Sequence, residues 1–324
     1  MTYRLALVLA LVLLAPCSSP VFATPPETRA EDDPPVQRPI TVGQAAVLGV
    51  VEGLTEYLPV SSTGHLILAS HIMGLSRFIE ERAWLGRKLE SPPALGTFEI
   101  VIQFGAILAV LGLYRRRVMQ MTAGVLGRDR DGLRLTGLLM VAFAPAVVIG
   151  LLFHDFISEH LFSPATVCLA LAVGGAVMLA VERFTPVRRR ASHEGLGLLQ
   201  ITYTQALVIG LAQVIAMWPG TSRSMVTIVA AMLLGMSRLA AAEFSFLLAL
   251  PTLGGATVYA AWRGWEDLLH SAGWDGLLVG LVVSGIVAAL AVAGFVRYLT
   301  RHGLAAFGVY RILVALVLAV LLLR

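Results

Sequence analysis

Six stretches of this chain are apolar over about the length that a helix needs to cross a bilayer. They are Phe98–Tyr114, Leu135–Phe153, Pro164–Val181, Ala240–Trp262, Gly276–Arg297 and Leu304–Leu323. A hydrocarbon core about 30 Å thick takes about 20 apolar residues in helical form. The chain is 57% hydrophobic and only 14% charged, whereas soluble domains carry about 25% charged residues. The sequence therefore predicts an all-α integral membrane protein with six transmembrane helices.

The N-terminal part of the chain differs from this pattern. Arg4 precedes an apolar run from Leu5 to Ala15, and Val21-Phe22-Ala23 offers small residues to a signal peptidase. We interpret residues 1–23 as a signal-peptide-like segment. Residues 24–39 are rich in proline and acidic residues and have no periodic apolar face, so we expect a disordered linker. Residues 40–324 then form a single membrane domain.

Two further apolar regions are interrupted near their middle. Gln44–Leu75 is broken at Pro59, and Gln205–Met236 is broken at Pro219-Gly220. Each half has about 15 residues, or roughly 22 Å of helix, which is too short to cross. The pattern predicts two re-entrant helical hairpins, whose turns are tolerated at membrane depth only inside protein or along a cavity.

The two broken regions resemble each other at a spacing of 161 residues. The matching pairs are Gln44 and Gln205, Gly49 and Gly210, Ser61 and Ser222, Gly74 and Gly235, Ser76 and Ser237, and Arg77 and Arg238. Each region precedes three apolar stretches, and an odd number of crossings turns the second copy upside down. We expect an inverted-topology repeat, with repeat one at about 40–183 and repeat two at about 200–324.

Charged residues between the apolar stretches predict the orientation. Arginines cluster in alternate loops (Arg115–Arg117, Arg128–Arg134, Arg183–Arg190 and Arg301), whereas acidic residues occupy the others (Asp155, Glu159, Glu266 and Asp267). The positive-inside rule places the arginines in the cytoplasm and agrees with a signal peptide that leaves Thr24 outside. These arginines also account for the net charge of +4, so no nucleic-acid partner is implied.

Two carboxylates precede the first break. Glu52 and Glu56 are four residues apart and share one helical face. Their mutual repulsion in an apolar segment favours a bound cation, and a divalent metal such as Mg²⁺ suits oxygen ligands completed by phosphates. The alternative is a structural pair bonded to neighbouring helices. Intramembrane acids are costly, which favours a functional site.

Hydroxyl groups and a histidine follow the same break. Ser61, Ser62 and Thr63 begin the second half-helix, where one hydroxyl can cap it and the others, with free N–H groups, can bind an anion. His65 lies one turn further on. Beside two carboxylates it is a candidate proton donor or nucleophile, and a satisfied core histidine is the alternative.

The second break carries a cation. Arg223 lies between Ser222 and Ser224, with Thr227 one turn later. Its planar guanidinium matches phosphate oxygens, and a buried ion pair to Glu52 or Glu56 is the alternative. We expect a metal-bound diphosphate between the two tips, with Glu99, Gln103 and Glu243 supporting the site.

Glu52-Gly53-Leu54-Thr55-Glu56-Tyr57-Leu58-Pro59-Val60-Ser61-Ser62-Thr63-Gly64-His65 resembles the acidic motif of the bacterial undecaprenyl-diphosphatase, or bacitracin-resistance, family. Pro219-Gly220-Thr221-Ser222-Arg223-Ser224 with Thr227 is similar to its second motif, and the resemblance runs from about Ile40 to Leu323. It implies hydrolysis of undecaprenyl diphosphate to the monophosphate, recycling the lipid carrier of peptidoglycan synthesis, at an inner-membrane site open to the periplasm.

The resemblance implies catalytic positions at Glu52, Glu56, Ser61, Ser62, His65 and Arg223, and a divalent-metal requirement. From the residues themselves we expect Glu52 and Glu56 to hold Mg²⁺ or Ca²⁺. We expect phosphate contacts from Thr63, Ser222, Arg223, Ser224 and Thr227. Bacitracin would compete for the lipid substrate, and a homodimer stays open. The motifs do not decide whether Ser62 or His65 is the nucleophile. The competing class is a lipid-phosphate transporter, because broken helices in inverted repeats also build carriers.

Overall fold

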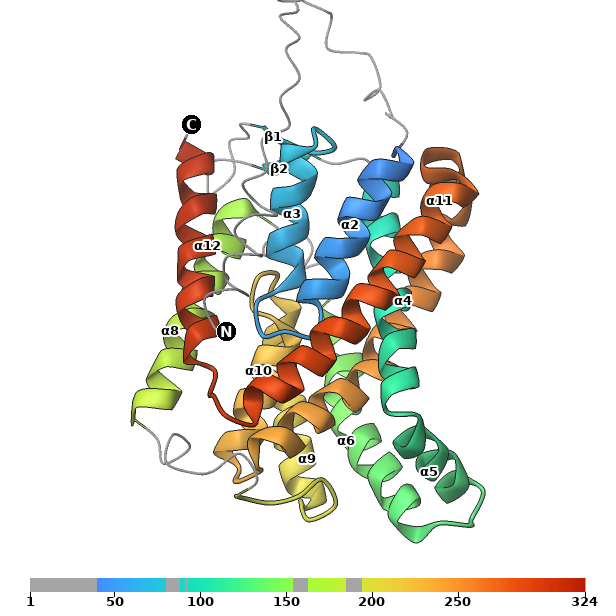
Figure 1. Cartoon of the computed structure of the whole chain (residues 1–324), viewed down its shortest axis with the longest axis vertical. Helices are drawn as coiled ribbons and strands as arrows, with labels where there is room; N and C mark the ends of the chain where they lie inside the picture. The colour runs from blue at the N-terminus through green and yellow to red at the C-terminus, as the bar shows by residue number, and fades with distance from the viewer. Residues whose placement is uncertain (1–39, 80–87, 91–92, 154–162, 185–193, 324) are drawn as a thin grey trace, which may run out of the picture. The chain divides into compact units, whose positions relative to one another are not determined.

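The computed structural model describes residues 40–79, 88–90, 93–153, 163–184 and 194–323 (Figure 1). The predicted signal segment and linker lie outside these residues, as do the loop with Asp155 and Glu159 and the arginines 188–190. The described chain from residue 40 onward belongs to one compact unit.

The described chain is helical apart from one short antiparallel sheet, β1 (Arg77–Ile79) paired with β2 (Lys88–Glu90). Its helices are α2 (Val42–Thr55), α3 (Ser62–Ile72), α4 (Pro93–Leu113), α5 (Arg115–Val125), α6 (Arg130–Leu152), α8 (Pro164–Phe184), α9 (Tyr203–Val214), the 3₁₀ turn Ile215–Met217, α10 (Arg223–Leu233), α11 (Arg238–Leu299) and α12 (Ala305–Leu323). The all-α prediction is correct except for this sheet.

Five helical segments of the described chain are long and apolar enough to cross a membrane. They are Ala94–Leu113, Arg130–Leu152, Pro164–Phe184, Arg238–Trp262 and Leu268–Leu299, with the C-terminal helix slightly shorter. Many of their large apolar side chains point outward, including Leu108, Val148, Leu169, Val282 and Leu290. Water would not stabilise such a surface, whereas lipid does. The chain is a multi-pass membrane protein.

Ala240–Trp262 and Gly276–Arg297 were expected as separate helices, and the structure confirms two helical spans, Arg238–Trp262 and Leu268–Leu299. The label α11 covers both, because they meet at a kink whose backbone is non-helical at Gly264 and Gly273. The second span begins earlier than predicted. The arginine-rich segment after α4 was expected as a loop but forms α5, a short helix with a polar and an apolar face.

The two predicted breaks are present. Proline cannot donate to the carbonyl four residues earlier and clashes with it; α2 ends at Thr55, four residues before Pro59, and α9 ends just before Ile215, four residues before Pro219. Figure 1 shows α2 and α3 side by side, joined by the first turn. The first tip comprises residues 56–61 and the second residues 218–222.

The two helix pairs share local details at the same spacing of 161 residues. Thr41 with Gln44 and Thr202 with Gln205 form identical capping boxes. The Gln44 amide donates to the Met73 carbonyl at 3.4 Å, and the Gln205 amide donates to the Leu234 carbonyl at 3.0 Å. These equivalent bonds fasten the outer ends of each pair together, and three long helical spans follow each pair.

Candidate active site

The first tip carries its acidic residues into the protein interior. Glu52 lies in the last turn of α2 and Glu56 directly follows that helix, with exposed fractions of 1% and 7%. The neighbouring Tyr57, Leu58 and Val60 are buried in the largest apolar cluster of the described chain. The turn is therefore part of the core.

Both tips end in a serine with the same unusual backbone. Ser61 has φ 74° and ψ 103°, and Ser222 has φ 74° and ψ 111°. Non-glycine residues seldom adopt positive φ, and such strain concentrates at functional sites. The Ser222 hydroxyl caps α10 by accepting from the Met225 N–H at 3.3 Å, whereas the Ser61 hydroxyl makes no such bond.

One ion pair joins the tips. Arg223 Nη2 donates to Glu56 Oε1 at 3.1 Å, and the Ser62 hydroxyl donates to Glu56 Oε2 at 2.7 Å. Arg223 Nη1 donates to the Ser245 carbonyl on α11 at 2.9 Å, and the guanidinium carbon lies 5.6 Å from the ring centroid of Tyr57. The carboxylate of Glu56 thus holds the predicted hydroxyl and the predicted cation together, and the ion pair named as the alternative is present.

The hydroxyl side chains at the start of α10, directly after the second tip, bond to other groups of the protein. The Ser224 hydroxyl donates to the Leu58 carbonyl of the first tip at 2.8 Å and lies 3.1 Å from the Ser222 hydroxyl. The Thr227 hydroxyl donates to the Arg223 carbonyl at 2.8 Å and lies 2.7 Å from the Ser245 hydroxyl. Ser224 and Thr227 therefore fix the tip, while Thr63 in the first turn of α3 is half-buried.

His65 has both ring nitrogens engaged. Nδ1 lies 2.7 Å from the Ser61 carbonyl, and Nε2 lies 2.7 Å from the Tyr310 hydroxyl on α12. Since a carbonyl can only accept, Nδ1 carries the proton, and in the neutral ring Tyr310 donates to Nε2. Neither nitrogen faces the Ser62 hydroxyl, which donates to Glu56 instead.

Glu52 is the least satisfied group of the site. Neither of its buried carboxylate oxygens has a well-aligned hydrogen bond within the described chain. The charges of Glu56, Glu99 and Arg223 act on it, and the Gln103 side chain acts on it as a hydrogen-bond partner. A buried carboxylate without a well-aligned hydrogen bond is costly, so this position suits a cation.

Two of the three expected supporting residues lie near Glu52. Gln103 and Glu99 act on it directly, and the Ser70 hydroxyl donates to Glu99 at 2.8 Å. Glu243 instead pairs with Arg117 of α5 at 2.8 Å and does not support the site.

The side chains that could hold the expected metal are few. Within the described residues, no group of three or more His, Cys, Asp or Glu side chains could hold a metal ion. Glu52 and Glu56 alone offer two carboxylates, which fits a hard divalent cation that takes one or two protein carboxylates and completes its coordination with phosphate oxygens and water.

Sequence reasoning did not identify three residues that contact the site. Tyr310 binds His65, Ser245 binds Arg223 and Thr227, and Arg311 binds the backbone of both tips. The signal was available for two of them, because Tyr310-Arg311 places a phenol and a guanidinium inside an apolar helix, where charged side chains are rare and functional.

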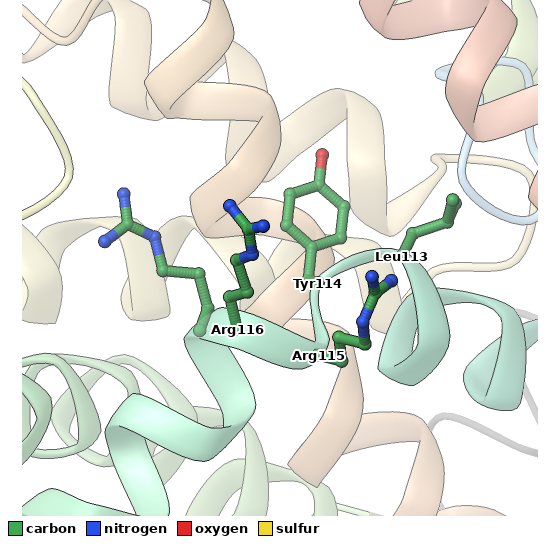
Figure 2. A pocket seen from close by; sticks show the side chains of 5 residues that line it. Leu113, Tyr114, Arg115 and Arg116 are labelled. Atoms are coloured by element: carbon green, nitrogen blue, oxygen red, sulfur yellow. The ribbon is translucent and has the colours of Figure 1, made fainter.

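A surface pocket lies elsewhere, where α4 meets α5. It is lined by Leu113, Tyr114, Arg115, Arg116 and Arg117, and Figure 2 shows arginine side chains on either side of Tyr114. It includes none of the predicted site residues. Aromatic and basic residues at the end of a spanning helix are typical of a membrane–water interface.

Comparison with known proteins supports the resemblance read from the motifs. The family model described as bacitracin resistance protein BacA matches residues 45–317. An undecaprenyl-diphosphatase of Sorangium cellulosum is 51% identical over 270 residues, covering 83% of this chain and 82% of that protein. An undecaprenyl-diphosphatase 1 of Stutzerimonas stutzeri is 44% identical, covering 83% and 90%, and an undecaprenyl-diphosphatase of Pseudomonas aeruginosa PAO1 is 45% identical, covering 84% and 90%. The helical membrane architecture, the two broken helix pairs and these matches together show that the chain belongs to the bacitracin resistance protein BacA family.

Proposed function

We propose that this protein hydrolyses undecaprenyl diphosphate to undecaprenyl phosphate and inorganic phosphate, which recycles the lipid carrier of peptidoglycan synthesis and confers bacitracin resistance. The observation that carries the proposal is the buried contact of Glu56 with both Ser62 and Arg223. Phosphoryl transfer needs a nucleophilic hydroxyl, a carboxylate that accepts its proton and a cation that binds phosphate, and these three groups are in contact here. Relatives at 41–51% identity are named undecaprenyl-diphosphatase.

Ser62 is the nucleophile in this proposal. Its Oγ attacks the terminal phosphorus, and its proton passes to Oε2 of Glu56, which already accepts its hydrogen bond. The bond from phosphorus to the bridging oxygen breaks, and the lipid monophosphate leaves. A water molecule then cleaves the phosphoserine, which releases inorganic phosphate and restores the serine, and Glu56 releases its proton to solvent. His65 is engaged on both nitrogens and orients the first turn of α3 through Ser61 and Tyr310.

Arg223 neutralises the charge that develops on the phosphoryl oxygens. Its Nε is buried and has no partner within the described chain, so the fork has a free donor in addition to those that bind Glu56 and Ser245. Fixed donors aimed at developing charge cost no reorganisation during the reaction. Backbone N–H groups, Thr63 and Ser222 at the starts of α3 and α10 complete the proposed phosphate contacts.

A divalent cation, Mg²⁺ or Ca²⁺, is part of the proposal. Glu52 and Glu56 would hold it, and when bound it would offset the negative charge of the diphosphate. The burial of Glu52, with neither oxygen in a well-aligned hydrogen bond, supports this assignment. Without a cation, two carboxylates and a diphosphate would repel one another at this depth.

The proposed arrangement is an inverted-topology repeat with six spans and two re-entrant pairs in the bacterial inner membrane, with the site open to the periplasm. The matching caps and the matching positive-φ serines at a spacing of 161 residues support the repeat. The prenyl chain would lie between helices in contact with lipid, where bacitracin would compete for the diphosphate outside. A homodimer is also part of the proposal.

Phosphate release by the purified protein in detergent tests the proposal. We expect release from undecaprenyl diphosphate with Mg²⁺ or Ca²⁺ and loss of release with EDTA. Glu56→Gln should lower kcat by at least about 10³-fold, because it removes both the proton acceptor and a ligand. Glu243→Gln is the matched control, since that carboxylate pairs with Arg117 outside the site. A transporter would move the lipid without cleaving it, so the purified protein in detergent would release no phosphate.

A further inference from the structure

Arg311 is a buried charge that the proposed reaction does not use. It lies within α12, is 0% exposed, and has no acidic partner in the part of the chain that the structure describes. A buried cation without a carboxylate is costly in a protein interior and more so within a membrane. The hydrogen bonds of Arg311 must therefore offset the cost of burying its charge.

The Arg311 guanidinium donates only to main-chain carbonyls. Nη2 binds Gly220 at 2.9 Å and Ala170 at 3.1 Å, Nη1 binds Pro59 at 3.4 Å, and Nε approaches Leu171 at 3.4 Å. Ala170 and Leu171 belong to α8, whereas Pro59 belongs to the first tip and Gly220 to the second. One side chain thus spans both tips and a long helix.

The two tip carbonyls occupy equivalent places. Pro59 and Gly220 are separated by 161 residues, as are Ser61 and Ser222, and each precedes its positive-φ serine by two positions. The two terminal nitrogens of a planar guanidinium lie at a fixed separation. Arg311 therefore holds the same backbone point of each tip in a fixed relation to the other.

Helix α8 leaves little freedom to this guanidinium. A Cβ placed on Gly174 would overlap Arg311 Nη2, so the absence of a side chain there makes room for the fork. Gly220, with φ +92°, lies so near α8 that an added Cβ would come 2.5 Å from the Val167 carbonyl. The arginine and the second tip are both packed closely against α8.

We propose that Arg311 is a positioning residue that pins the two tips together through Pro59 and Gly220 and so sets the separation between Ser62, Glu56 and Arg223. Its kinetic consequence rests on the proposed function. Pro59 lies three residues from both Glu56 and Ser62, and Gly220 lies three residues before Arg223. A displacement of the Pro59 or Gly220 carbonyl would therefore move the reacting groups. A misplacement of about 1 Å in such a site can cost about 10²-fold in rate.

The test compares two perturbations with a matched control. Arg311→Lys keeps the charge but loses the fork, and Gly174→Ala keeps the arginine but displaces it. Arg134→Met is the control, because Arg134 also binds two carbonyls, of Leu199 at 3.1 Å and Ile201 at 3.0 Å, near the start of α6 and away from both tips. Each protein is assayed for kcat and KM with undecaprenyl diphosphate, and for amide hydrogen exchange in peptides covering residues 56–62 and 217–224.

We expect Arg311→Lys and Gly174→Ala to lower kcat by about 10–100-fold with KM changed less than about threefold, and to raise exchange in both tip peptides together. Arg134→Met should leave kcat and tip exchange unchanged. Unchanged tip exchange in both variants, or exchange that rises equally in every helix, would overturn the proposal, because Arg311 would then only stabilise the fold. Wild-type protein that releases no phosphate would refute the proposed function, and tip exchange would still decide the role of Arg311.

Discussion

At the scale of single residues, the Arg223 guanidinium makes two different kinds of bond. Nη2 binds the Glu56 carboxylate and Nη1 binds the Ser245 carbonyl, so the side chain is held from both sides of the site. The bond to Ser245 fixes its direction, and the bond to Glu56 keeps a buried carboxylate compensated when no phosphate is bound. If the proposed reaction holds, this ion pair serves both the fold and the reaction.

This geometry predicts that Arg223→Lys is nearly as damaging to kcat as Arg223→Ala. A lysine ammonium keeps the charge, but it has no planar fork and cannot hold Glu56 and Ser245 while it binds phosphate. By analogy with the loss of one oxyanion donor, kcat should fall about 10²–10³-fold, and more than KM rises. Kinetics and melting temperature of both variants provide the measurement. A lysine variant within about threefold of wild type, beside an unstable alanine variant, would assign Arg223 to the fold alone.

The sequence predicted the residues of the site better than their partners. Glu56, Ser62 and Arg223 were each predicted and lie in direct contact across the two tips. The partner of His65 was missed, because Tyr310 is 245 residues away and no local pattern joins them. Buried polar contacts between distant segments depend on packing that periodicity does not encode.

At the scale of helices, glycine allows close approach of α2 and α4 to the second half of α11. A Cβ on Gly53 would overlap the Ser284 carbonyl, a Cβ on Gly105 would overlap the Leu281 carbonyl, and one on Gly49 would come 2.7 Å from the Gly280 carbonyl. Small residues at helix contacts replace the hydrophobic driving force that lipid does not supply. The first helix pair is thereby fixed against a span of the second half of the chain.

We predict opposite effects for two glycine substitutions in α4. Gly105→Ala should lower stability by about 1–3 kcal/mol, because the methyl group would force α4 away from α11. Gly112→Ala, on the same helix with nothing within 4 Å of the added carbon, should be neutral or stabilising by up to about 1 kcal/mol through helix propensity. Thermal unfolding of both variants in detergent measures the difference, and equal melting temperatures would contradict this packing.

The helical elements were predictable where local chemistry decides them. Prolines at 59 and 219 end α2 and α9 as expected, because the effect of proline acts within four residues. The two spans of α11 were predicted as separate helices, and the kink at Gly264 and Gly273 lies around the acidic residues that suggested the connection. Helix α5 was missed because three consecutive arginines suggest a loop, yet its residues also have good helix propensity.

At the scale of the whole membrane domain, hydrogen bonds join neighbouring helices at two opposite ends of the domain. Arg134 binds the carbonyls of Leu199 and Ile201, which joins the start of α6 to the start of α9. Glu182 accepts from the Leu304 N–H at 2.6 Å, which joins the end of α8 to the start of α12. The Ile40 N–H donates to the Ser271 carbonyl at 2.7 Å near the bend of α11. Figure 1 shows the α5–α6 turn and the bend of α11 at opposite ends of the helices.

This separation predicts which positions a reagent added outside the cell can reach. With Cys17 and Cys168 replaced by serine, a cysteine at Glu266 should react with a membrane-impermeant maleimide in spheroplasts. Cysteines at Arg116 and Arg301, both exposed at the basic end, should react only after the membrane is permeabilised. The reason is that translocation retains short arginine-rich segments in the cytoplasm.

Each variant must keep phosphate release, so that labelling reports a working fold. Labelling at Arg116 in intact spheroplasts with protection at Glu266 would reverse the orientation. The first helix pair would then enter from the cytoplasm, and the proposed site would act on lipid diphosphate in the inner leaflet.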